Sequence, residues 1–147
     1  GDSTQKNKPA SFGYSFYNKK VPSIVLNIGN KKIDLSSDRR KFILAVDSQD
    51  PAIQDFLRYV IKSCNVKNAS PLVLFMTKKD SIHIDSLRVE TYESAAFDNF
   101  FKIKKSDYFL IVISRDNHIK YFAIDHLPDR RNIKALLGRT LDEDQSL

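Results

Sequence analysis

Residues 42–64 constrain the fold more than any other stretch, because an unbroken apolar run passes directly into an amphipathic pattern. The run FILAV at residues 42–46 predicts a strand covered on both faces, as in a parallel or mixed sheet. Asp50 is a good N-cap, and Pro51 suits the first position of a helix because its missing N–H is not needed there. The stretch therefore predicts a central strand followed by a helix from about Pro51 to Cys64.

The only cysteine of the sequence belongs to the apolar stripe of that helix. A reactive thiol needs partial exposure and a positive environment, whereas Cys64 stands at the C-terminal end, where the helix dipole disfavours an anion. We therefore expect Cys64 to be a buried apolar side chain. A single cysteine allows no disulfide within the chain and leaves the redox compartment open. The stripe repeats at helical spacing and consists of Ile53, Phe56, Leu57, Val60, Ile61 and Cys64.

The size of the chain sets its domain organisation. With 147 residues, 41% of them hydrophobic, it is long enough for one domain with a full core and too short for two comfortable ones. We expect a polar leader or tether over residues 1–10, one domain over residues 11–140 and a disordered tail over residues 141–147. No apolar run approaches the length that crosses a bilayer. The leader would fit an exported protein held at a membrane by an N-terminal lipid anchor.

The net charge of +6 and the pI of about 9.4 raise the question of a polyanionic partner. The basic residues are scattered along the whole chain, mostly with acidic residues close by. Such scatter is typical of a solvated surface, and no nucleic-acid-binding motif accompanies it. We therefore expect no nucleic-acid partner, while a basic domain that binds polyanions stays an alternative.

The remaining apolar segments complete an α/β pattern around the central strand. Residues 72–76 (LVLFM) predict a second interior strand, so the intervening helix makes a βαβ crossover, which is right-handed as a rule. Gly29-Asn30 is a turn dipeptide between two short strands and predicts a β-hairpin. The other predicted elements are an edge strand or packed arm over residues 11–17, a loop with one helical turn over 78–86, a strand nearer an edge over 87–92, a short helix over 94–101, a hairpin of strands 108–113 and 119–124, and a closing helix that Asp129 caps and that runs to about Leu137.

This order of elements resembles the thioredoxin-like domains of the TlpA and redoxin (AhpC/TSA) type over about residues 21–137. Residues 23–36 (SIVLNIGNKKIDLS) are similar to the opening hairpin of that family, and residues 109–119 (FLIVISRDNHI) are similar to its late hairpin. The resemblance implies a three-layer α/β sandwich, with helices on both sides of a central mixed sheet and an N-terminal β-hairpin. It also implies a location in the periplasm or cell envelope, for example as a lipoprotein.

The sequence departs from that family at the two places where the family carries its chemistry. A cysteine pair, or a single peroxidatic cysteine, stands there between the central strand and its helix, but here residues 47–52 read DSQDPA. A cis-proline precedes the next-to-last strand in the family, but here residues 105–108 read KSDY. Thiol–disulfide exchange requires a thiolate, so the family's reaction is not available at this position.

Other chemistries have little support in the sequence. His83, His118 and His126 lack the short spacing of metal ligands, and we expect neither a metal nor a cofactor. Ser48 with His118 or His126 as its base would be a nucleophilic pair, but no pattern selects these residues. The four glycines are scattered, which excludes a glycine-rich phosphate loop.

The candidate site is the mouth of the fold, where the central strand ends and the late hairpin begins. A groove retained there would bind a peptide or a small ligand. Alternatively, the residues at the mouth only cap a helix and solvate a rim. The topology implied by the resemblance brings six residues to the mouth, namely Asp47, Ser48, Asp50, Pro51, Ser106 and Tyr108.

These observations favour a redox-inactive thioredoxin-like domain that acts as a binding or assembly module for a protein or peptide partner. It would contact a membrane only through the N-terminal anchor. An enzyme with divergent chemistry at the same mouth is a second hypothesis.

Overall fold

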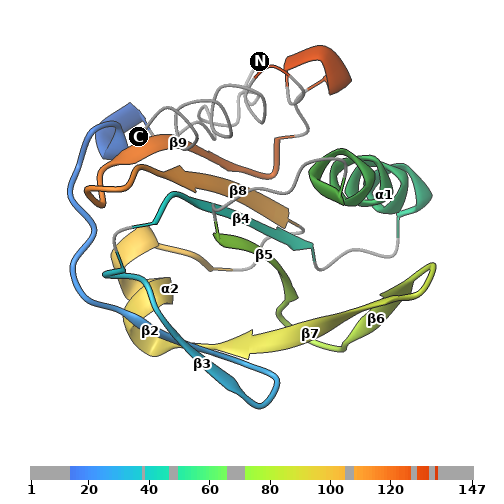
Figure 1. Ribbon diagram of the computed structural model, residues 1–147, viewed down its shortest axis with the longest axis horizontal. Helices are drawn as coiled ribbons and strands as arrows, with labels where there is room; N and C mark the ends of the chain where they lie inside the picture. Colours follow the sequence, from blue (N-terminus) through green and yellow to red (C-terminus); the bar gives the residue numbers. More distant parts are fainter. Residues whose placement is uncertain are drawn as a thin grey trace, which may run out of the picture.

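The structure is a computed structural model that describes residues 14–37, 39–46, 50–65, 72–104, 108–126, 129–132 and 135. The predicted α/β class is confirmed, because eight strands form one mixed sheet and helices lie on both of its faces (Figure 1). In chain order the helices and strands are η1 (Tyr14–Phe16), β2 (Val25–Ile28), β3 (Lys31–Asp34), β4 (Lys41–Val46), α1 (Pro51–Asn65), β5 (Leu72–Thr77), β6 (Ile82–Ile84), β7 (Leu87–Glu93), α2 (Ala95–Phe101), β8 (Tyr108–Ile113) and β9 (Ile119–Ile124).

The predicted central strand, β4, lies in the interior of the sheet. The strand order is β3-β2-β7-β5-β4-β8-β9, with β6 paired to β7. β4 pairs parallel with β5 and antiparallel with β8, and all six of its residues are buried. The predicted βαβ unit is confirmed, because α1 connects β4 to β5. The hairpins β2–β3 and β8–β9 are confirmed as well, and Gly29 has the positive φ of 57° that the first of these turns requires.

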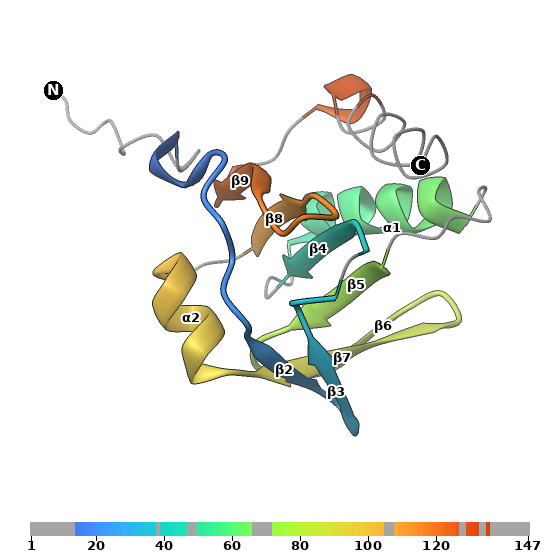
Figure 2. The ribbon, with the colours of Figure 1, turned by 60° about the vertical axis from the view of Figure 1, so that its left-hand side comes forward.

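Alternate residues of β4 face opposite layers of the core. Phe42, Leu44 and Val46 pack in the layer that contains the apolar side of α1. Ile43 and Ala45 pack in the layer that contains α2. Helices cover both faces of the strand, as the two views of the ribbon show (Figures 1 and 2), which explains why the run has no polar residue between its ends.

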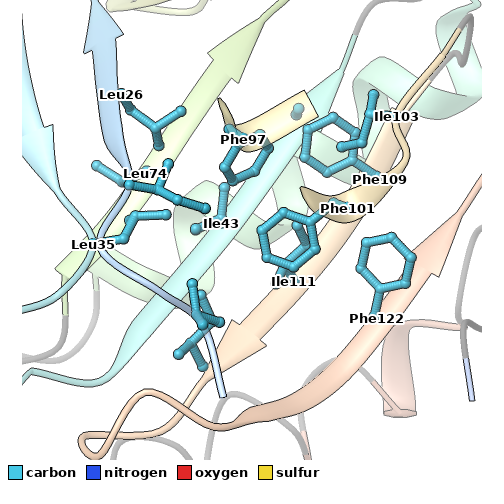
Figure 3. Packing of buried hydrophobic residues seen from close by; sticks show 14 of the residues in the cluster. Leu26, Leu35, Ile43, Leu74, Phe97, Phe101, Ile103, Phe109, Ile111 and Phe122 are labelled. Atoms are coloured by element: carbon cyan, nitrogen blue, oxygen red, sulfur yellow. The ribbon is translucent and has the colours of Figure 1, made fainter. Parts of the chain in front are cut away.

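The layer on the α2 side is built around phenylalanines (Figure 3). Phe97 and Phe101 are fully buried and Phe100 is half-buried, in agreement with the short helix predicted there. Phe16 of η1 inserts into the same layer, with its ring centroid 4.8 Å from that of Phe122. Since η1 is a 3-10 turn, the described part of the N-terminal segment, residues 14–17, is a packed arm rather than an edge strand.

The predicted connection between β5 and β7 is wrong. Residues 82–84 form β6, which pairs antiparallel with the start of β7, in place of a loop with one helical turn. Ile84 is buried in the α1-side layer, and Ile82 packs against it. β7 itself lies between β2 and β5, third from the β3 edge of the sheet. β6 has only three residues of apolar alternation, which is too short to predict a strand without knowledge that it pairs with β7.

The predicted cap of the closing helix is confirmed. Asp129 Oδ1 accepts a hydrogen bond from the backbone N–H of Asn132 at 2.9 Å. The Tyr59 hydroxyl donates to the Arg130 carbonyl at 3.3 Å, so this helix begins beside α1. The predicted leader and tail fall outside the described residues. Across the described part of the chain, every helix is too short or too polar to span a bilayer.

Candidate functional site

The N-terminus of α1 lies at the end of the sheet where β4 stops, and Asp50 caps it. Asp50 Oδ1 accepts a hydrogen bond from the Ala52 N–H at 2.9 Å. The Asp50 carbonyl accepts from the Ile53 and Gln54 N–H groups at 3.1 and 3.0 Å. Pro51 is the first helical residue, so the predicted capping by Asp50 and Pro51 is confirmed.

Tyr108 lies at the same end of the sheet, because it opens β8 and pairs with Val46, the last residue of β4. Its side chain is only 9% exposed and packs in the α1-side layer, so it belongs to the core beneath the mouth. Asp125, which follows β9, donates from its N–H to the Tyr108 carbonyl at 2.9 Å. Sequence reasoning missed Asp125, which has a positive φ of 53° and ends the hairpin at the mouth.

The other predicted mouth residues, Asp47, Ser48 and Ser106, fall outside the described residues, so the convergence of all six stays a prediction. Cys64 lies in the last turn of α1, where the periodicity predicts it, and its side chain is likewise outside the description. An α-helix rises about 1.5 Å per residue, which places the Cys64 backbone about 20 Å from Pro51 along the helix. The backbone of the only cysteine is therefore far from the mouth.

Two histidines lie apart from any cluster of ligands. His83 is exposed on β6, and His126 is half-buried beyond β9. Among the described residues, no group of three or more His, Cys, Asp and Glu side chains is arranged to hold a metal ion.

His118 belongs to a polar network in the turn between β8 and β9. Ser114 Oγ donates a hydrogen bond to Asp116 and accepts one from the His118 backbone N–H at 3.0 Å. His118 Nδ1 lies 3.1 Å from Asp116 Oδ2. In a catalytic triad the hydroxyl is hydrogen-bonded to the imidazole, and the other nitrogen of the imidazole is hydrogen-bonded to the carboxylate. Here the Ser114 hydroxyl is hydrogen-bonded to the Asp116 carboxylate instead. The network therefore closes a turn and does not supply a nucleophile.

This network predicts a pH-dependent contribution to stability. The Ser114 hydroxyl, followed by the His118 imidazole, lowers the pKa of Asp116 from 3.8 to about 2. Since the folded pKa lies below the unfolded one, the carboxylate stabilises the fold above about pH 4, and this contribution is lost as the pH falls to about 2. We expect Asp116→Asn to lower the urea midpoint at pH 6 and to leave it unchanged at pH 2. A difference between the two proteins that does not vary with pH would contradict this reading. As a control, Ser114→Ala should raise the Asp116 pKa, followed by NMR, more than His118→Gln does.

Lys41, the first residue of β4, is fully buried. Its burial was not predicted from the sequence. Its Nζ donates to the Ser37 carbonyl at 2.6 Å, the Arg39 carbonyl at 2.5 Å and Asn117 Oδ1 at 2.7 Å. Asn117 Nδ2 donates in turn to the Ser36 carbonyl at 3.2 Å. This cluster lies at the N-terminal end of β4, so it holds the end of the sheet opposite the mouth.

The β4–α1–β5 unit, the second helix on the other face and the closing antiparallel hairpin give the chain a thioredoxin-like fold. It is similar to a proposed protein disulfide isomerase from Bacteroides thetaiotaomicron, at 10% identity over 92% of this chain and 95% of that chain, with a TM-score of 0.64. It is similar to an exposed lipoprotein thioredoxin from Streptococcus pneumoniae, at 11% identity over 83% and 99% of the two chains, with a TM-score of 0.59. For a thiol peroxidase from Chromobacterium violaceum the identity is 16% over 89% and 91%, with a TM-score of 0.52. The sequence matches no protein-family model and no curated protein. At such identities the likeness establishes the fold and not the activity.

Proposed function

We propose that this chain is a redox-inactive thioredoxin-like domain of an exported, membrane-tethered protein and acts as a binding or assembly module. The observation that carries the proposal is the start of α1, which follows β4 with Asp50 and Pro51 and without a thiol. The sole cysteine, Cys64, stands about 20 Å further along that helix.

The electrostatics at the start of α1 support the loss of thiol chemistry. A thiolate at a helix N-terminus is stabilised by the free backbone N–H groups of the first turn and by the helix dipole. Here the Ala52 N–H already donates to the Asp50 carboxylate at 2.9 Å. A negative group that permanently occupies this position would raise the pKa of a nearby thiol and would repel a thiolate. The first turn is therefore arranged for capping.

The exported location rests on two supports. One of the similar structures is that of an exposed lipoprotein thioredoxin. The first ten residues of the present sequence, GDSTQKNKPA, are polar enough to serve as a tether. The binding role follows from the mouth, where the ends of β4 and β8 meet, because a fold that retains this edge without a thiol can still present backbone and side chains to a peptide.

Thiol–disulfide exchange and peroxide turnover test the proposal directly. In insulin reduction with dithiothreitol and in hydrogen peroxide consumption, we expect rates equal to those of buffer for the native chain and for Cys64→Ser. Gln49→Cys/Asp50→Gly/Ala52→Cys, which places a Cys-x-x-Cys pair across the start of α1 and removes the Asp50 carboxylate, is the positive control and should reduce insulin at least tenfold faster than buffer.

Two outcomes would overturn redox inactivity. Activity of the native chain that Cys64→Ser abolishes would assign thiol chemistry to the far end of α1. Activity that survives Cys64→Ser and is lost in Asp50→Asn would favour an enzyme with different chemistry at the mouth.

A further inference from the structure

The N-terminal arm exposes an aromatic side chain that the core does not need. Tyr17 is 65% exposed, the highest value among the large hydrophobic side chains of the described residues, although Phe16 next to it is buried. Phe16 packs against rings of α2 and β9, with centroids 5.9 Å from Phe101 and 4.8 Å from Phe122. The arm is anchored through Phe16, so Tyr17 is directed outward by a fixed turn.

The backbone around Tyr17 is held by hydrogen bonds to β9 and its preceding turn. The Asn18 N–H donates to the Ile119 carbonyl at 2.7 Å, and the Ile119 N–H donates to the Lys19 carbonyl at 2.9 Å. The Val21 N–H donates to the Asn117 carbonyl at 2.7 Å. Exposure of Tyr17 therefore does not come from a frayed end, and a partner would meet a preorganised surface.

Three exposed lysines belong to the same arm or to β9, with which the arm pairs, and their described contacts are with neutral groups. Lys120 Nζ lies 5.8 Å from the centre of the Tyr17 ring and donates to Asn18 Oδ1 at 2.9 Å. Lys19 Nζ lies 5.2 Å from the centre of the Phe100 ring. Lys20 adjoins the β8–β9 turn through a backbone bridge to His118.

The described contacts of the Asp116 carboxylate in that turn are with Ser114 and His118. We call the set Tyr17, Lys19, Lys20 and Lys120 the Tyr17 patch. It combines one exposed phenol ring with three exposed lysines, and Lys120 lies over that ring.

We propose that the Tyr17 patch binds the anionic headgroups of a lipid bilayer. A tyrosine places its ring at the hydrocarbon boundary and its hydroxyl among headgroups. Each lysine near an anionic bilayer contributes about a fivefold gain in partitioning. η1 lies at the periphery of the molecule in both ribbon views, which suits contact with an extended surface (Figures 1 and 2).

Single-stranded nucleic acid fits the Tyr17 patch less well. Proteins that bind single strands stack successive bases on a series of exposed aromatic rings. Among the described aromatic side chains around this arm, Tyr17 is exposed, whereas Phe16 is buried and Phe100 half-buried. The proposal goes beyond the function proposed above, because it concerns a different surface and does not depend on the state of the mouth.

The sequence contains no tryptophan, which permits a single-reporter experiment. With the unlipidated chain, Tyr17→Trp should show a blue shift of tryptophan emission when vesicles of phosphatidylcholine and 30% phosphatidylglycerol are added, and no shift with phosphatidylcholine alone. Val25→Trp is the matched control, because Val25 is also exposed (45%) but lies on β2, near the other edge of the sheet. Equal shifts for both reporters, or none for Tyr17→Trp, would overturn the proposal.

Removal of positive charge from the Tyr17 patch gives a quantitative test. Lys19→Gln/Lys120→Gln should lower the partition coefficient for the anionic vesicles about 30-fold in sedimentation at low salt. Lys31→Gln/Lys32→Gln removes the same charge from the edge strand β3 and should change it less than about threefold. Equal losses would mean that net charge alone drives binding, and stronger binding to a single-stranded oligonucleotide at equal phosphate concentration would assign the patch to nucleic acid. Either result overturns the proposal, and neither bears on redox inactivity at the mouth.

Discussion

Lys41→Met is expected to lower the free energy of unfolding by about 3 kcal/mol at neutral pH, measured by urea denaturation. Lys41 is fully buried, and its ammonium group donates to three oxygens at 2.5 to 2.7 Å. Hydrogen bonds to a charged group contribute about 1.5–3 kcal/mol each, and an acceptor left unsatisfied in the interior costs about 1–3 kcal/mol. Relief of the cost of burying a charge offsets part of this loss. Methionine keeps most of the volume of the stem, so the change reports on the polar contacts.

Lys62→Met is the control for this experiment, since Lys62 is exposed on α1 and its replacement should change stability by less than about 0.5 kcal/mol. Asn117 supplies a double-mutant cycle. Its φ is 67°, so Asn117→Gly removes the side chain without adding backbone strain. We expect a coupling energy of about 1–2 kcal/mol between positions 41 and 117. A Lys41→Met protein within 1 kcal/mol of the native chain, or an additive cycle, would show that the carbonyl cluster is not a source of stability.

The Lys41 cluster and the mouth lie at opposite ends of β4. Lys41 and Asn117 join the loop before β4 to the turn between β8 and β9, at the N-terminal end of the central strand. Asp50 and Tyr108 lie at the opposite end of the same strand. Lys41→Met should therefore leave the binding that we propose for the mouth unchanged once the protein is folded.

Lys41 also shows where reasoning from the sequence fails. In the sequence it closes the basic run Arg39-Arg40-Lys41, which has the composition of a solvated turn. Its burial depends on an acceptor from Asn117, 76 residues away. No local pattern contains that information. The same applies to β6, whose three residues become a strand only because β7 folds back onto them.

The parts of the fold that the sequence predicts are those with local causes. The run at residues 42–46 can be covered on both faces only in the interior of a sheet, and Asp50-Pro51 can start a helix without help from other segments. At the mouth the same distinction holds. Capping by Asp50 is local and was predictable, whereas the hydrogen bond from Asp125 to the start of β8 spans 17 residues and was not.

Phe101→Ala is expected to lower the free energy of unfolding by about 3–5 kcal/mol, because a fully buried phenylalanine loses both its transfer energy and the contacts around the cavity left behind. Its ring joins three segments, with centroids 4.8 Å from Phe97, 5.9 Å from Phe16 and 5.5 Å from Phe122. Figure 3 shows Phe101 with Phe97 and Phe122. Phe100→Ala is the matched control on the same helix. Phe100 is only half-buried, so its loss should be about 1–2 kcal/mol.

Phe101→Ala should also loosen the N-terminal arm. Phe16 is the residue of the arm that lies in the core, and Phe101 is one of the rings that hold it. The amides of Asn18 and Val21 donate to carbonyls of residues 119 and 117. Without the Phe101 ring, these two amides should lose more of their native protection against exchange than the amides of β4 lose. Hydrogen exchange under native conditions measures this directly. If these amides kept their native protection in Phe101→Ala, the presentation of Tyr17 would have to come from the backbone pairing with β9 alone, without support from the core beneath it.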